Sequence, residues 1–110
     1  MSIVMNLYYT GTNGNARKFA EEMERSGTAD LIRNESGNER YEYFLPMDDP
    51  ETVLLIDIWK NQEAIDRHHA STMMQKITQL REKYDLHMRA ERYVTGEEGI
   101  PDSDVKFIKK

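Results

Sequence analysis

Two of the three histidines, His68 and His69, stand side by side in the segment that follows the single tryptophan, Trp59. An imidazole of ordinary pKa exchanges a proton near neutral pH, so either residue could serve as a general base. Adjacent residues on a helix point about 100° apart, so the two side chains cannot do the same job. One interpretation is a buried structural histidine beside a surface histidine, and the other is a catalytic base.

Other polar or polarisable side chains could assist such a base. Asn6 is an amide on a strand that is otherwise mostly apolar and aromatic. Tyr8, Tyr43 and Arg92 offer hydrogen-bond donors to an anionic oxygen, although tyrosines on strands usually only pack. Met73 is one of seven methionines, whose thioethers either line a pocket for a flat ligand or simply fill the core.

Composition excludes several classes of protein. The chain has 110 residues, which is normally one domain with one modest core. Its formal charge of −5 offers no basic face for nucleic acid. Without cysteine it has no disulfide, thiolate metal site or cysteine nucleophile. Because the N-terminus lacks a signal-peptide pattern and no apolar run is long enough to span a membrane, we expect a soluble cytoplasmic protein without membrane partners.

Hydrophobic periodicity and turn residues predict the elements that position these side chains. Gly27 ends the first helix, Asn61 can cap the helix that carries the histidines, and a break follows that helix near residues 70–72. The predicted strands are 3–10, 39–47, 52–60 and 85–95, and the predicted helical segments are 16–26, 28–35, 62–70 and 72–84.

The resulting order, β α β β α β, is that of a ferredoxin-like α+β fold with helices on one face of an antiparallel sheet. Residues 1–95 form this domain, and residues 96–110 form a C-terminal tail that we expect to be either loosely attached or docked on a partner subunit. In the strand 52–60, alternation suggests that Leu54, Ile56 and Ile58 face the helices. Val53, Leu55, Asp57 and Trp59 then make a second apolar face, which predicts a homodimer.

The segment DDPETVLLIDIWKNQEAIDRHHAS resembles the antibiotic biosynthesis monooxygenase family. The family pattern is a strand that ends in an acidic residue, one intervening residue and tryptophan, followed by a helix whose histidine precedes a break of small residues. These positions hold Asp57, Trp59, His68 and residues 70–71. The resemblance extends from the first strand to about Tyr93.

The resemblance implies a dimeric α/β barrel in which each subunit keeps its own pocket. It also implies oxidation of a quinol or polyhydroxylated aromatic by O2 without metal, flavin or haem. In that case His68 is the base, Asn6 hydrogen-bonds substrate or oxygen, and Trp59 shapes the pocket. Deprotonation makes such an aromatic electron-rich enough to reduce O2 directly, so the protein need supply only a base, oxyanion donors and a dry cavity.

The sequence departs from the family in two places. Many members carry a second histidine soon after the break, where this chain has Met73. Haem-degrading relatives place an axial histidine in the following helix, and the matching position here is Thr78, so haem ligation from that position is excluded.

Three other kinds of site fit the sequence less well than this one. YYTGTNGNARKF resembles the phosphate loop of flavodoxins, but a single βα unit followed by a hairpin disfavours FMN binding. Adjacent histidines do not converge on one metal ion, and Ser71 lacks the context of a hydrolase nucleophile. A non-catalytic dimeric module that binds an aromatic metabolite, and a base-catalysed isomerase on the same barrel, stay open.

Overall fold

The elements follow the predicted order in the computed structural model, which describes residues 1–96 and 99–109. The helical segment after Trp59 is split in two, as the predicted break requires, and α5 is an additional short helix in the tail. The bounds are β1 (Ile3–Thr10), α1 (Asn15–Arg25), α2 (Thr28–Arg33), β2 (Asn38–Phe44), β3 (Thr52–Trp59), α3 (Gln62–His69), α4 (Thr72–Lys83), β4 (His87–Val94) and α5 (Asp102–Val105).

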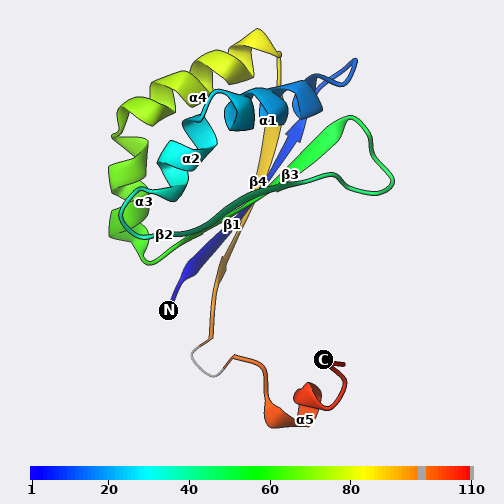
Figure 1. The fold of residues 1–110 in the computed structure, drawn as a ribbon, viewed down its shortest axis with the longest axis vertical. Helices are drawn as coiled ribbons and strands as arrows, with labels where there is room; N and C mark the ends of the chain where they lie inside the picture. The colour runs from blue at the N-terminus through cyan, green and yellow to red at the C-terminus, as the bar shows by residue number, and fades with distance from the viewer. Residues whose placement is uncertain (97–98, 110) are drawn as a thin grey trace.

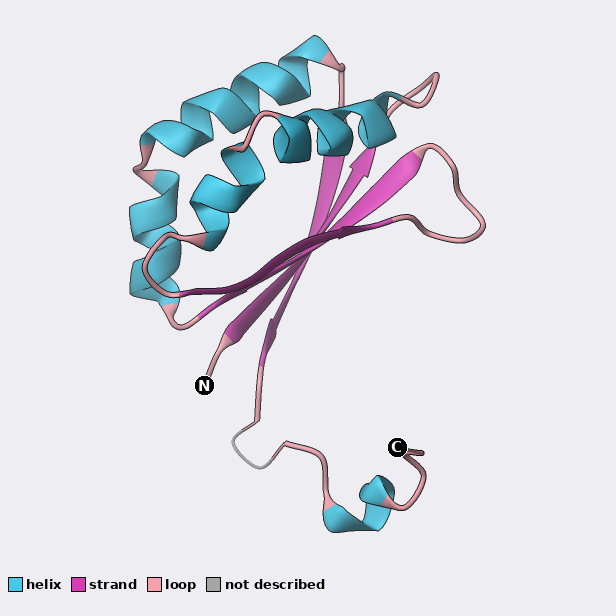
Figure 2. Cartoon of the chain, in the orientation of Figure 1, coloured by secondary structure: helices cyan, strands magenta, loops and turns pink. Residues whose placement is uncertain are grey.

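The strands of the described chain pair antiparallel in one sheet, in the order β2-β3-β1-β4. Helices α1 to α4 lie together on one face of this sheet, while the opposite face is left open (Figures 1 and 2). This is the predicted ferredoxin-like α+β architecture. Because β3 and β1 are the central strands, their helix-facing side chains form the floor of the core.

The side of β3 that faces the helices differs from the prediction. Met5 of β1 lies opposite Asp57, and both point toward the helices. The expectation that Leu54, Ile56 and Ile58 face the helices is therefore wrong, and these three are half-buried on the open face. Both faces of this central strand carry large aliphatic residues, so alternation alone does not distinguish them. The buried set on the helix side is Val53, Leu55, Asp57 and Trp59.

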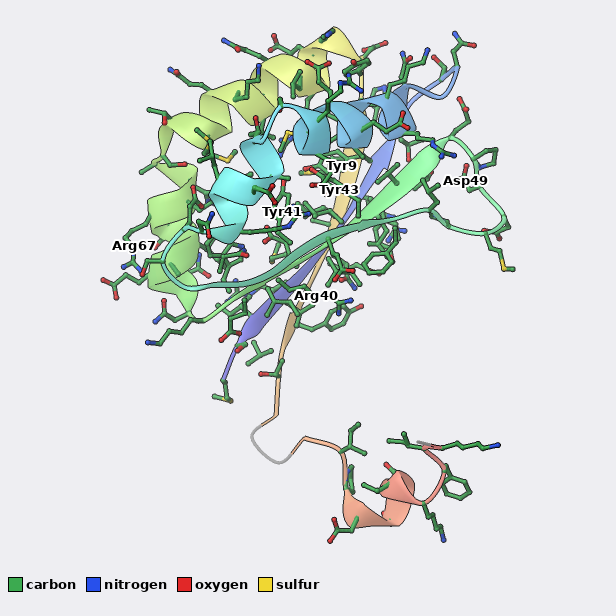
Figure 3. All side chains as sticks on the ribbon, viewed as in Figure 1. Tyr9, Arg40, Tyr41, Tyr43, Asp49 and Arg67 are labelled. Atoms are coloured by element: carbon green, nitrogen blue, oxygen red, sulfur yellow. The ribbon has the colours of Figure 1, made fainter. Side chains whose placement is uncertain are left out.

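Side chains from every helix of the domain fill the space above the sheet. The apolar stripe of α1 supplies Phe19 and Met23, and Phe19 packs against the Tyr9 ring with 5.0 Å between centroids. Figure 3 shows Tyr9, Tyr41 and Tyr43 between the sheet and the helices. The other buried members of this core are Ile3, Ala29, Ile32, Leu55, Trp59, Ala64, Ile65, Ile77 and Leu80.

Local hydrogen bonds fix both ends of α3. Asn61 caps it as predicted, because its Oδ1 accepts from the Ala64 N–H over 2.9 Å. The helix ends at His69 with Ala70 as its C-cap, and the Ser71 hydroxyl donates to the His68 carbonyl over 2.6 Å. The buried face of α3 consists of Ala64, Ile65 and His68, so the helix directs one histidine inward.

The open face of the sheet and the tail carry side chains that helices α1 to α4 do not cover (Figure 1). The Arg89 guanidinium stacks 3.9 Å above the Tyr8 ring, and Arg40 lies on the same open side (Figure 3). In the tail, Phe107 is exposed, as are Ile100, Val105 and Ile108. Glu97, Glu98 and Lys110 of the predicted tail lie outside the described residues.

In the part of the chain that the structure describes, no helix has the length and apolar character to span a membrane.

Gly37 lets the loop before β2 approach α3, and this close contact gives a prediction. Its φ is +88°, and a Cβ added there would lie 2.6 Å from the Ala64 Cβ. Gly37→Ala therefore combines left-handed strain with overpacking and should lower the free energy of unfolding by about 2 to 4 kcal/mol in urea titrations.

Gly14→Ala is the matched control, because Gly14 has a φ of +75° but no neighbouring atom within 4 Å of an added Cβ. This variant should lose only the backbone contribution, about 1 to 2 kcal/mol. Equal losses in the two variants would show that the contact with α3 contributes nothing.

Candidate functional site

A cavity of about 270 Å³ lies between the helix face of the sheet and helices α3 and α4. Its walls are mostly apolar and include Met5, Leu7, Leu55, Ile65, Met74 and Ile77. The polar groups that reach it are Tyr9, Tyr41, Asp57, His68, His69 and Arg81. A few polar groups converging in an apolar cavity are typical of a small-molecule site.

A second hollow, about 590 Å³, lies between α1 and the β2–β3 hairpin. It is larger and more open, but its charged residues are the surface side chains Arg17, Glu21, Glu24 and Arg25. No histidine and no buried carboxyl group lines it within the described chain. The smaller cavity therefore has the groups that proton-transfer chemistry needs.

His68 is held in the smaller cavity from two sides. Its ring packs against the Trp59 indole with 4.8 Å between centroids, and only 6% of the residue is exposed. Its Nδ1 lies 2.6 Å from Glu35 Oε2. Because the carboxylate accepts this hydrogen bond, Nδ1 carries the hydrogen and Nε2 is the nitrogen able to accept a proton.

Burial lowers the pKa of the His68 imidazole, and the Glu35 carboxylate opposes this effect. The imidazole is therefore neutral at pH 7. Glu35 follows α2 and lies 33 residues before His68, so no local spacing marks the pair in the sequence. A neutral imidazole with its ring orientation fixed by a carboxylate is the arrangement that a general base requires.

Asp57 is the other titratable group brought into the cavity by β3. It is 5% exposed, and the Asn38 side-chain amide donates to its Oδ1 over 3.3 Å. Burial raises the pKa of this carboxyl to about 7, and Trp59 and Asn38 only partly offset the effect. One signal of this residue is visible in the sequence, where an acidic side chain lies between Ile56 and Ile58 in an apolar run.

Arg81 of α4 and Tyr9 of β1 meet at the same cavity. Arg81 Nη2 donates to the Tyr9 hydroxyl over 3.2 Å, and its guanidinium lies 5.3 Å from the Tyr9 ring centroid. Burial raises the pKa of Tyr9, and Arg81 opposes that shift. The Arg81 Nε is buried without a hydrogen-bond partner among the described residues. These donors suit an oxyanion in the cavity.

The structure places the remaining predicted site residues elsewhere. Asn6 and Tyr8 lie on the open face of β1, since their cross-strand partners are Ile56 and Leu54. The Tyr43 hydroxyl pairs with that of Tyr41 at 3.1 Å, and Tyr43 lines the wider hollow. In the helix α4, Met74 rather than Met73 lines the cavity, and Arg92 of β4 donates to Gln62 on the surface. Of the predicted site residues, His68 and Trp59 are the two brought together.

The cavity thus combines a neutral base, a carboxyl that is half protonated near pH 7 and a guanidinium. This set can remove a proton from a hydroxyl group, hold the resulting anion and return a proton elsewhere. Within residues 1–96 and 99–109, no cluster of three histidine or carboxylate side chains could hold a metal ion.

Burial of Asp57 predicts a pH-dependent loss of stability. Its pKa is about 7 in the folded protein against an ordinary value of 3.8. Between these values the folded state binds a proton that the unfolded state releases, so stability falls as the pH rises. Asp57→Asn should therefore be more stable than the wild type by about 2 to 4 kcal/mol at about pH 8, and the difference should vanish near pH 4.

Urea unfolding at the two pH values measures this difference. Asp66→Asn makes the same chemical change on the exposed face of α3 and should alter stability little at either pH. A wild type that is no less stable than Asp57→Asn at the higher pH would contradict the buried neutral carboxyl.

Solved structures share the fold around this cavity. A conserved protein from Methanosarcina mazei has a TM-score of 0.75 and 16% identity, over 87% of this chain and 94% of its own. Rv0793 from Mycobacterium tuberculosis has a TM-score of 0.74 and 13% identity, over 91% of this chain and 100% of its own. A mutant of SnoaB, a cofactor-independent oxygenase from Streptomyces nogalater, has a TM-score of 0.73 and 15% identity, over 92% of this chain and 98% of its own. At these identities the likeness shows the fold.

Sequence comparison gives a family. No curated protein matches the chain. The family model described as antibiotic biosynthesis monooxygenase matches residues 1–80, which include Glu35, Asp57, Trp59 and His68. The chain therefore belongs to the antibiotic biosynthesis monooxygenase family.

Proposed function

We propose that the protein is a monooxygenase that oxidises a quinol or polyhydroxylated aromatic with O2, without a bound metal or organic cofactor. The observation that carries this proposal is the position of His68 at an apolar cavity beside Trp59. Its neutral imidazole is oriented by Glu35, whose Oε2 lies 2.6 Å from Nδ1. Family membership supports the reaction class. The fold is shared with SnoaB, a cofactor-independent oxygenase.

A quinol can supply all the electrons that the reaction consumes. One quinol and one O2 give a hydroxyquinone and one water, so one oxygen atom enters the ring and no external reductant is needed. His68 Nε2 takes the first hydroxyl proton, and Arg81 with Tyr9 holds the phenolate oxygen. The phenolate then passes an electron to O2, and the two radicals combine at a ring carbon. Trp59 and Met74 provide the wall for a flat ring.

The test of the base is O2 consumption with a panel of naphtho- and benzohydroquinols, with autoxidation subtracted. His68→Gln removes the basic nitrogen with little change in volume and should lower kcat at least tenfold, about 1.4 kcal/mol of transition-state stabilisation. His87→Gln, on the exposed edge strand β4, is the matched control and should retain activity.

Each other outcome has a definite meaning. Equal turnover by the wild type and His68→Gln would remove His68 from the mechanism. Proton exchange into the aromatic without O2 uptake would favour the base-catalysed isomerase. Ligand binding without either reaction would favour a non-catalytic binding module.

We further propose that two copies associate through their open sheet faces. Leu54, Ile56 and Ile58 give this face an apolar centre on β3. Asn6 lies beside them on β1, and its Oδ1 is buried without a hydrogen-bond partner among the described residues. A second sheet would cover the apolar side chains and offer donors to this amide oxygen. The apolar side chains of the tail are then available to dock on the partner.

Ile56→Glu tests this arrangement, because it places a charge at the centre of the proposed interface. Light scattering should give twice the 12.9 kDa chain mass for the wild type and the monomer mass for the variant. Thr78→Glu on the exposed side of α4 should stay dimeric. A monomeric wild type would overturn the proposed dimer.

A further inference from the structure

A peroxide bound to the ring must gain a proton before its O–O bond can break at neutral pH. Under the proposed function the proton that His68 takes up is needed later, when the leaving oxygen forms water, so the peroxide must receive its proton from a second group. The cavity offers three further candidates on strands, which are Tyr9, Tyr41 and Asp57. Burial raises the pKa of both tyrosines above their ordinary value, which makes them poor proton donors.

Asp57 lines the cavity, and its carboxyl group has two hydrogen-bonding neighbours. Asn38 donates to Oδ1, and the Trp59 side chain is the other neighbour. No lysine, arginine or histidine of the described chain forms an ion pair with this carboxyl group. It lies in the wall of the same cavity as the His68 ring and the Arg81 guanidinium.

The groups packed around Asp57 favour its neutral form. Tyr41 from β2 and Met5 from β1 flank it across the strands, and Tyr9 lies further along β1. Glu35, on the loop after α2, is the nearby anion and disfavours a second negative charge. His68 on α3 is neutral, and the Arg81 guanidinium on α4 donates to Tyr9. Burial outweighs the partial compensation from Asn38 and Trp59.

We propose that Asp57 is the second catalytic residue, a neutral carboxylic acid that hydrogen-bonds an oxygen of the bound aromatic and gives its proton to the ring peroxide. This inference rests on the proposed oxygenation. The Asp57 proton makes the hydroperoxide, and the carboxylate then takes the ring C–H proton as the O–O bond breaks and a carbonyl forms. The leaving oxygen departs as hydroxide and takes the proton held by His68, which gives water. Both residues return to their starting states.

Asp57→Asn separates hydrogen bonding to the aromatic from proton transfer to the peroxide. An amide donates a hydrogen bond at every pH but cannot transfer this proton. We expect kcat for hydroquinol oxidation to fall at least tenfold. In the wild type kcat should decline above pH 7 as Asp57 ionises. In the variant this alkaline decline should disappear. Asp66→Asn, on the exposed side of α3, should keep the wild-type rate and profile. An unchanged rate and an unchanged alkaline decline in Asp57→Asn would overturn the proposal.

Binding of 2-methyl-1,4-naphthoquinone tests the same residue without turnover. This probe has no titratable group, so any pH dependence of its Kd belongs to the protein. The wild type should bind it about tenfold more weakly well above pH 7, and Asp57→Asn should bind it equally at all pH values. A wild-type Kd that does not change with pH overturns Asp57 as a donor.

The two readouts distinguish failure of the inference from failure of the proposed function. If no hydroquinol is oxidised but probe binding shows the expected dependence on Asp57, the oxygenation is overturned and the hydrogen-bond donor is supported. Oxidation that does not respond to Asp57→Asn leaves the oxygenation standing and overturns Asp57 as acid. Protein that neither oxidises the quinols nor binds the probe overturns both.

Discussion

The register of β3 against β1 and β2 decides which side chains of the central strand meet the helices. It places Val53, Leu55 and Trp59 in the core and brings Asp57 with them, because all four share one face of the strand. A buried carboxyl without a cation is unfavourable when ionised, so the fold keeps it partly protonated at neutral pH. A shift of one residue would bury the aliphatic face instead and remove the acid from the cavity.

The second constraint is the loop that joins α2 to β2. Its backbone approaches α3 at Gly37, whose carbonyl accepts from the Lys60 N–H over 2.8 Å just before that helix begins. Two residues earlier in the same loop, Glu35 holds Nδ1 of His68. The loop therefore positions the carboxylate against a helix that Asn61 and Ser71 fix at its two ends. The packing of the loop against α3 and the hydrogen bond to Glu35 together fix the orientation of the His68 ring.

Much of the architecture could be read from local patterns, because alternation in β1, the stripe of α1 and the Asn61 cap depend only on nearby residues. The orientation of β3 could not, since a central strand that is apolar on both sides gives no alternation to read. Similarly, Glu35–His68 and Arg81–Tyr9 join residues far apart in sequence. His68 and Trp59 were accessible from the motif, whereas the groups that orient and complement them required the fold.

The pKa values in the cavity are displaced in the directions that acid and base roles need. Burial favours the uncharged form of both groups, so the same apolar walls lower the pKa of His68 and raise that of Asp57. When His68 and Asp57 are both neutral, two charged groups of the described residues are left beside them. These are the Glu35 carboxylate, which is hydrogen-bonded to His68, and the Arg81 guanidinium. One anion can therefore form beside Arg81 without meeting a bare negative charge. The apolar lining that weakens the fold at Asp57 also strengthens the interaction of the Arg81 guanidinium with an anion in the cavity.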